Sequence, residues 1–195
     1  MRKRTIIPIE GLTKETQNLF DSLEEETDLG VVVIGAAFLD VCLGTLLSHF
    51  FLEGNISDAL LVKGPLNEFV ARAKVAYALG LISKIAFQDL VCIAEIRNTF
   101  AHHHLALSFD FTDIRDLCKK LQCGKDMTNA LAFDQYLLLP RTQFTLSVVA
   151  LASRLMVDCL GTKRRPVSTE LFQSFSRERA LATRSTRPGR RPKRS

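Results

Sequence analysis

The hydrophobic positions of this chain recur mainly at helical spacing. Leu19, Phe20 and Leu23 share one helical face, and longer segments further along repeat such a stripe every three or four residues. No alternating run is sustained, and no Asn-Gly or Asp-Gly hairpin signal is present. The predicted helices cover residues 13–26, 28–51, 66–79, 83–101, 112–121 and 141–160. The sequence therefore predicts an all-α body that forms a single helical bundle.

Capping residues define the predicted boundaries. Thr13, Asp28 and Ser83 have side chains that can cap a helix N-terminus. Pro65 and Pro140 stand at predicted helix starts, where the N–H that proline lacks is not needed. Between these helices we expect a short turn at residues 57–62, and residues 122–139 receive no assignment.

The segment Leu29–Leu52 is apolar and long enough to cross a bilayer. Asp40 lies close to its middle and His49 near its end, and a carboxylate is costly in lipid. We therefore interpret the segment as a buried bundle helix and expect no membrane contact. Its small residues Gly35, Ala36 and Gly44 would let another helix approach closely, either within the chain or in a homodimer.

Charge divides the chain into unequal parts. Residues 161–195 carry eleven Lys and Arg against two Glu, a net charge of +9, whereas residues 1–160 carry a net charge of −4. We expect an N-terminal arm at 1–11, a helical domain at 12–160 and a basic, disordered tail at 161–195, because the end of the chain lacks apolar residues that would order it. Such asymmetry indicates a polyanion or an acidic partner, or serves solubility alone.

The five cysteines favour a reduced compartment. Cys42, Cys92 and Cys159 sit in apolar runs, where a thiol behaves as a small hydrophobic side chain. Their number is odd, and no C-x-x-C pair is present. Because Pro8 and Glu10 interrupt the apolar start of the chain, we also expect no signal peptide and a cytoplasmic protein.

The most informative segment is Glu95–His104, at the end of a predicted helix. Asn98 and His102 are four residues apart and share a face, with Arg97 obliquely beside them. An Arg and a His at this spacing resemble the signature of HEPN-domain ribonucleases, in which Arg97 would hold a phosphate and His102 would move a proton. We favour a structural polar cluster of Asp40, Arg97, Asn98 and His102 with no catalytic residue, in which Arg97 pairs with Asp40 as a latch between helices.

The histidine run at 102–104 does not predict a metal site. Consecutive helical residues point about 100° apart, so three such side chains do not converge on one ion. The sequence also contains no glycine-rich phosphate loop, G-x-S-x-G or H-E-x-x-H motif. We therefore expect no metal, no cofactor and no enzymatic activity.

The helices at 66–79 and 83–101 can be drawn as a helix-turn-helix pair. The second helix is largely apolar and offers only Lys84 and Arg97 as basic residues, which is a poor recognition surface for DNA. Basic residues of the tail are better candidates for weak, salt-sensitive nucleic-acid or polyanion contact. They are Arg187, Arg190, Arg191, Lys193 and Arg194.

Several blocks in succession resemble the mannitol operon repressor family over about residues 12–160. These blocks are Val33–Asp40, Gly64–Phe69, Ala73–Ser83, Ile96–His102 and Leu107–Asp110. The resemblance implies an all-helical, bacterial, cytoplasmic repressor of mannitol uptake genes without an evident DNA-binding domain. It also implies that Asp40, Arg97, Asn98 and His102 form a polar cluster of the family.

From these observations we expect a transcriptional regulator of sugar-alcohol uptake genes or of a related operon. It would act mainly through protein partners and form a homodimer, with the tail assisting. A HEPN-like ribonuclease or toxin that uses Arg97 and His102 is the alternative, and a plain dimeric scaffold is a third hypothesis.

Overall fold

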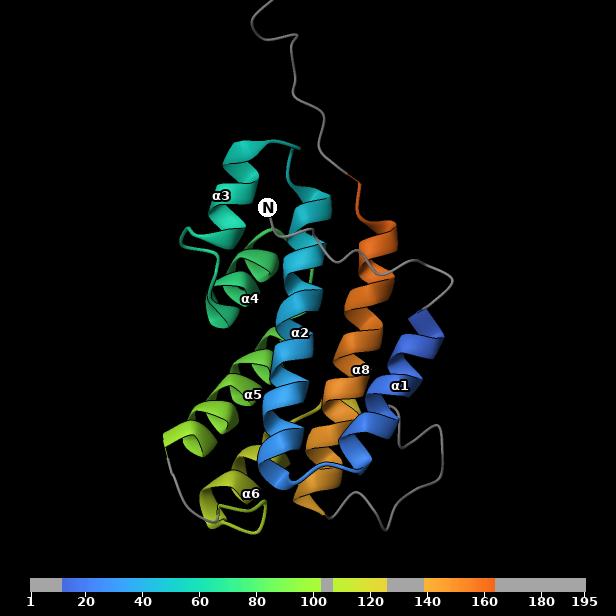
Figure 1. Ribbon diagram of the computed structural model, residues 1–195, viewed down its shortest axis with the longest axis vertical. Coiled ribbons are helices and arrows are strands. Elements are labelled where there is room, and N and C mark those ends of the chain that lie inside the picture. The colour runs from blue at the N-terminus through green and yellow to red at the C-terminus, as the bar shows by residue number, and fades with distance from the viewer. Residues whose placement is uncertain (1–11, 103–106, 126–138, 164–195) are drawn as a thin grey trace, which may run out of the picture. The chain divides into compact units, whose positions relative to one another are not determined.

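A computed structural model describes residues 12–102, 107–125 and 139–163 of the chain (Figure 1). The chain divides into two compact units, Met1–Arg164 and Arg165–Ser195, and all described residues belong to the first. The predicted arm, the predicted tail from residue 164 onwards and the histidines at 103 and 104 lie outside the described residues; the tail prediction began too early, because Gly161 still belongs to the last helix.

The described part is all-α, as predicted, and contains no strand. The helices are α1 (Leu12–Glu24), α2 (Asp28–Phe50), α3 (Asn55–Val62), α4 (Phe69–Ala78), α5 (Lys84–His102), α6 (Thr112–Lys120) and α8 (Pro140–Gly161).

Helix α2 is the centre of the bundle. It contacts α1, α3, α4, α5 and α8, and the side chains of Val31, Leu39, Leu43 and Leu46 have no exposed surface. A Cβ built at Gly35 would lie 3.2 Å from both methyl groups of Val148, so this glycine lets α8 approach α2 closely. The small residues of α2 predict a close helix contact, and at Gly35 this contact is made with α8 of the same chain.

Local chemistry explains the starts of three helices. Thr27, one residue before the predicted cap Asp28, is the N-cap of α2, and its hydroxyl accepts a 3.1 Å hydrogen bond from the N–H of Gly30. The hydroxyl of Ser83 caps α5 by accepting from the N–H of Ala86. Pro140 opens α8 as predicted. The predicted cap at Asp28 was wrong because this carboxylate binds Arg141 of α8 and the N–H of Phe109, as described below.

The region between α2 and α4 differs from the prediction. Residues expected to form a short turn form helix α3, and α4 begins at Phe69 rather than near Pro65. A turn occupies residues 63–68, and a Cβ at Gly64 would lie 2.8 Å from the carbonyl oxygen of Ala59. The side chain of Arg72 in α4 stabilises this turn, because it donates a hydrogen bond to the main-chain carbonyl of Leu66.

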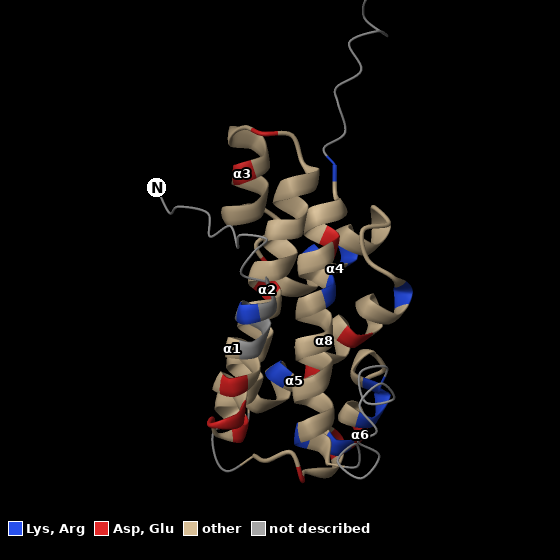
Figure 2. Ribbon diagram, turned by 90° about the vertical axis from the view of Figure 1, so that its right-hand side faces the viewer, with Lys and Arg blue, Asp and Glu red and all other residues tan. Residues whose placement is uncertain are grey.

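Two helices, α2 and α8, are long and apolar enough to cross a membrane by length and composition. About half of each helix is buried inside the bundle, and each takes part in an ion pair with another helix. Core helices of bundles have the same composition. Figure 2 marks the charged residues on the ribbon and shows acidic residues gathered at the end of α1.

Candidate functional site

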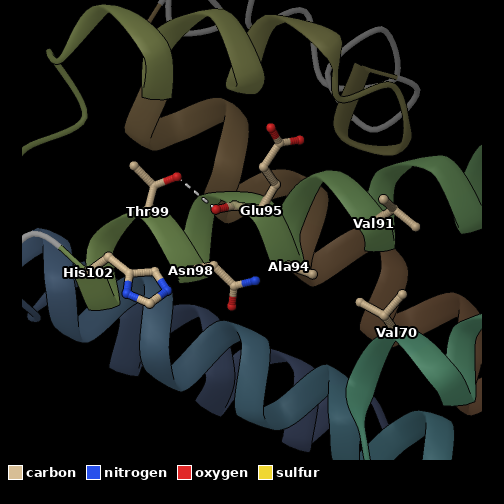
Figure 3. A pocket seen from close by; sticks show the side chains of 7 residues that line it. All are labelled: Val70, Val91, Ala94, Glu95, Asn98, Thr99 and His102. Carbon is tan, nitrogen blue, oxygen red and sulfur yellow. Dashed lines mark hydrogen bonds between the residues drawn. The ribbon is translucent and has the colours of Figure 1, made fainter.

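A groove with polar residues at its rim lies along the outward face of α5, next to α4 (Figure 3). Its volume is about 400 Å³, and its lining residues are Val70, Val91, Ala94, Glu95, Asn98, Thr99 and His102. All except Val70 belong to α5. The groove contains two residues that the sequence analysis singled out, Asn98 and His102.

Helical spacing explains why these side chains line one groove. Val91, Glu95, Asn98 and His102 follow one another at steps of four, three and four residues, so they project from one face of α5. Buried residues such as Ile93 and Ile96 occupy the opposite face. Glu95, Asn98 and His102 are exposed, which leaves their polar atoms accessible to a ligand.

Arg97 does not line the groove. It is half-buried, and its guanidinium carbon lies 5.9 Å from the centre of the Phe69 ring of α4. Its Nη2 donates a 3.1 Å hydrogen bond to Oδ1 of the neighbouring Asn98. Arg97 is thus directed towards α4, and it reaches the groove only through its hydrogen bond to Asn98.

The ion pair of Asp40 is formed with Arg72 rather than with the expected Arg97. Nη1 of Arg72 lies 2.8 Å from Oδ1 of Asp40, and the same nitrogen donates to the main-chain carbonyl of Asp40 at 3.0 Å. The motif in α5 indicates Arg97 as the partner of Asp40. In the fold, however, α4 brings Arg72 closer to Asp40. The exposure of Asn98 and His102 also contradicts a latch buried between helices; a shared role of the four residues stays a prediction.

Burial raises the pKa of Asp40 above its ordinary value of 3.8. The nearby charge of Arg72, its hydrogen bond and, more weakly, the charge of Arg97 act in the opposite direction. Arg97 is therefore close enough to influence Asp40 without being its partner. Desolvation outweighs the attraction because Asp40 is only partly compensated in a largely apolar setting.

Arg72 is the structural residue that the sequence analysis missed. Its Nε donates to the carbonyl of Leu66 at 2.8 Å, and its Nη2 donates to the carbonyl of Leu61 at 3.0 Å. Its guanidinium lies over Gly44, where a Cβ would be 3.3 Å from Nη1. One feature of the sequence could have indicated this ion pair. Gly44 stands one helical turn after Asp40 and leaves room for a large cation beside it.

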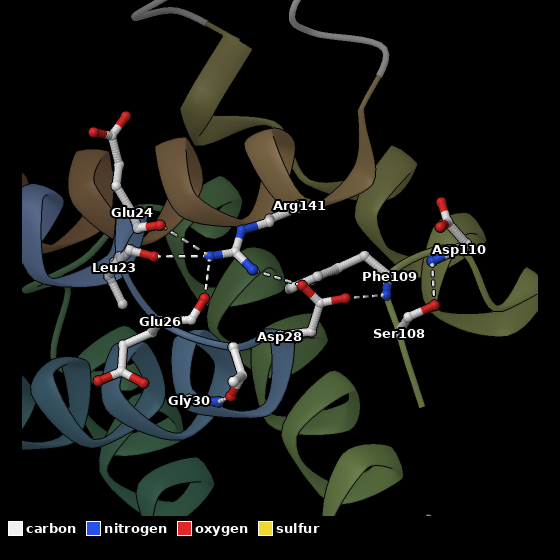
Figure 4. A network of polar contacts seen from close by, with 10 residues as sticks. Leu23, Glu24, Glu26, Asp28, Gly30, Ser108, Phe109, Asp110 and Arg141 are labelled. Carbon is white, nitrogen blue, oxygen red and sulfur yellow. Dashed lines mark hydrogen bonds and ion pairs between the residues drawn. The ribbon is translucent and has the colours of Figure 1, made fainter. Parts of the chain in front are cut away.

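A second polar network joins α1, α2 and α8 (Figure 4). Arg141 of α8 forms a 2.6 Å ion pair with Asp28 and donates hydrogen bonds to carbonyls at the end of α1, including that of Leu23 at 3.1 Å. The other carboxylate oxygen of Asp28 accepts from the N–H of Phe109 at 3.0 Å. These bonds connect distant parts of the chain, so we assign this network to the structure of the bundle.

The cysteines are free thiols. Burial raises the pKa of Cys42 and Cys118 to about 12 and that of Cys92 and Cys159 to about 11. At neutral pH these four thiols are protonated and therefore weak nucleophiles. Among the described residues, no group of three or more His, Cys, Asp or Glu side chains is placed to hold a metal ion.

By its fold, the described part of the chain belongs to the class of all-helical bundle proteins. The profile of the mannitol repressor family matches residues 18–154, and the chain belongs to that family. The match spans the groove, Arg72 and both polar networks.

A solved structure also resembles the chain. The crystal structure of the MtlR–HPr complex from Escherichia coli contains a chain that aligns with a TM-score of 0.56 and 18% sequence identity. The alignment covers 72% of this chain and 98% of that one, and it supports the fold. No curated protein matches this sequence.

Proposed function

We propose that this protein is a cytoplasmic transcriptional regulator of sugar-alcohol uptake genes or of a related operon, and that its helical body acts by binding a protein partner in the α5 groove. Membership of the mannitol repressor family supports the regulatory role. The observation that carries the binding role is the exposed row of Glu95, Asn98 and His102 above an apolar floor.

The chemistry of the groove suits a protein partner. Val70, Val91 and Ala94 supply apolar surface, and an amide, a carboxylate and an imidazole surround it. Protein interfaces commonly combine an apolar centre with a hydrogen-bonding rim. The MtlR of the similar structure is in complex with HPr, and we propose an HPr-type protein of the same organism as the partner here.

The α4–α5 pair offers no basic recognition surface for DNA. In the α4–α5 pair, the second helix exposes Glu95, Asn98 and His102, while Arg97 is half-buried against Phe69. A recognition helix needs cations and amides that reach base edges and phosphates. We therefore assign nucleic-acid contact to the basic tail, through Arg187, Arg190, Arg191, Lys193 and Arg194, as a weak and sequence-independent contribution.

Calorimetric titration with purified HPr of the same organism tests the partner. We expect Asn98→Ala and His102→Ala each to raise the dissociation constant by about tenfold, the effect of losing a central interface contact. Gln88→Ala is the matched control, because Gln88 is exposed on α5 but does not line the groove. Unchanged binding by both groove variants would overturn the assignment of the groove, and no binding by the wild type would overturn the choice of HPr.

The geometry does not favour the ribonuclease alternative. Arg97 and His102 project in different directions from α5, and Arg97 is held by Phe69 and Asn98. A phosphate bound by Arg97 would therefore have to compete with its hydrogen bond to Asn98. We expect the purified protein to leave RNA intact; cleavage that disappears in His102→Ala would show that this expectation is wrong.

A further inference from the structure

The side chain of Asn98 in the α5 groove has a defined orientation. Nη2 and Nε of Arg97 both donate to its Oδ1, at 3.1 Å and 3.4 Å. A guanidinium carries only hydrogen-bond donors, so the atom of the amide that faces it has to be the acceptor oxygen. The amide nitrogen therefore faces another direction, and Figure 3 shows it turned along the groove towards Ala94.

The guanidinium of Arg97 is itself held by contacts outside the groove. Its central carbon lies 5.9 Å from the centre of the Phe69 ring, and Phe69 is buried in α4. Burial raises the pKa of Asp40 on α2, and the charge of Arg97 is among the influences that oppose this rise, so the two charges lie near each other. Contacts with two other helices thus fix Arg97, and Asn98 is oriented before a partner arrives.

The orientation of Asn98 determines which hydrogen bonds the groove offers. Among the described residues, Nδ2 of Asn98 makes no hydrogen bond, so both of its N–H groups remain for a partner. The hydroxyl of Thr99 already donates its proton to the carbonyl of Glu95, and the ionised carboxylate of Glu95 can only accept. Among the described lining residues, the amide of Asn98 and the imidazole of His102 are therefore the side chains that donate.

We propose that Arg97 is a positioning residue of the groove, which holds the Asn98 amide with its nitrogen towards the partner. The groove thereby selects a protein partner that presents an acceptor oxygen at this point. A partner that presents a donor instead would have to displace Arg97 from Oδ1 and leave a half-buried cation without this hydrogen bond. The inference rests on the proposed function of the groove.

The role of Arg97 follows from the freedom of an amide. Without a partner at Oδ1, a half-turn about the last side-chain bond of Asn98 exchanges oxygen and nitrogen at little cost. Such an amide accepts as readily as it donates and does not discriminate between partners. The hydrogen bond from Arg97 removes this freedom, and a group that is ordered in advance loses less entropy on binding.

Replacing the amide of Asn98 with a carboxylate separates its two functions. Asn98→Asp keeps an oxygen that accepts from Arg97, but it removes both N–H donors from the groove. In calorimetric titration with HPr, we expect it to raise the dissociation constant at least as much as Asn98→Ala, by about tenfold or more. Gln88→Glu is the matched control, because it makes the same chemical change at an exposed site of α5 outside the groove and should bind normally.

A double-mutant cycle tests whether Arg97 acts through Asn98. Arg97→Met keeps an apolar stem against Phe69 and removes the donors, so it should raise the dissociation constant for HPr by about threefold to tenfold, the effect of one hydrogen bond. Arg97→Lys, which keeps the charge and a donor, should recover part of this loss. In the Asn98→Ala background, Arg97→Met should have no further effect, because no amide remains to be oriented.

The outcomes distinguish this inference from the proposed function. If Asn98→Asp binds HPr as tightly as the wild type, or if Arg97→Met has its full effect in the Asn98→Ala background, the inference is overturned and the groove assignment stands. Equal losses in Asn98→Asp and Gln88→Glu would also overturn it, because added charge alone would then explain the effect. A wild type that does not bind HPr would overturn both; thermal unfolding followed by circular dichroism verifies that each variant folds.

Discussion

At the scale of single residues, the site depends on how each charged side chain is compensated. The sequence indicates Asp40 and Arg97 as partners because both stand in apolar helices, but the nearer cation is Arg72. Arg97 is satisfied locally by Asn98 and the Phe69 ring. The charge of Asp40 is neutralised by the cation that lies closest to it in the fold. The spacing of residues along one helix does not reveal that distance.

Arg72→Met should lower the free energy of unfolding by about 3 kcal/mol. The change leaves Asp40 without its cation and removes hydrogen bonds from Leu61 and Leu66, and the low end of the range for broken buried pairs applies because Asp40 is partly exposed. Urea unfolding measures the effect. Lys74→Met, an exposed change on the same helix, should cost much less, and equal losses would contradict the role given to Arg72.

Asp40 should make stability fall as pH rises. Its folded pKa is raised above 3.8, so the folded state binds the proton more tightly than the unfolded state. Its contribution is largest below pH 3.8 and is lost as pH increases through the raised folded value. The unfolding free energy of the wild type minus that of Asp40→Asn should therefore decrease with pH above 3.8.

A surface carboxylate provides the control for this pH profile. The hydrogen bond and charge of Lys119 lower the pKa of the exposed Asp116, so its contribution is present above pH 3.8 and lost as pH falls. The difference between wild type and Asp116→Asn should thus have the opposite slope. Matching slopes for the two aspartates would contradict the assignment of desolvation to Asp40.

At the scale of elements, α1 is connected to the bundle through few polar contacts. Its Leu19 and Leu23 are buried, and its C-terminal carbonyls accept hydrogen bonds from Arg141 of α8. The same guanidinium pairs with Asp28 at the start of α2. One side chain therefore fixes the turn between α1 and α2.

Arg141→Ala should loosen α1 before the rest of the fold. We expect faster amide hydrogen exchange in α1 and a loss of about 2 kcal/mol in stability, because charge-assisted hydrogen bonds are removed. Exchange in α5 should change little. Arg154→Ala on the same helix is the control, since Arg154 pairs only with Asp158 four residues away among the described residues. Uniform acceleration in all helices would contradict this local role.

At the scale of the whole molecule, charge is divided between an acidic body and a basic tail. The body carries the groove, and the tail carries a net charge of +9. We propose that protein recognition and polyanion contact are separable properties of the chain.

Replacing Arg187, Arg190, Arg191, Lys193 and Arg194 with Gln should weaken nucleic-acid binding without affecting the HPr titration. Each lost phosphate contact should reduce the slope of log K against log salt by about 0.9 for duplex DNA. Fluorescence anisotropy across a salt series measures the slope. Unchanged DNA affinity would show that the tail does not contact nucleic acid and that the body is responsible for any DNA binding.

The sequence by itself determined the helical class and most helix boundaries, because periodicity, caps and proline act over a few residues. It also located Asn98 and His102 on one face of a helix. Tertiary structure decided that Asp40 pairs with Arg72, that Asp28 joins Arg141 rather than capping its own helix, and that residues 63–68 form a turn. It also decided which side of the uniformly apolar α2 stays exposed. These outcomes depend on distances between residues far apart in the chain, and only packing of the helices fixes such distances.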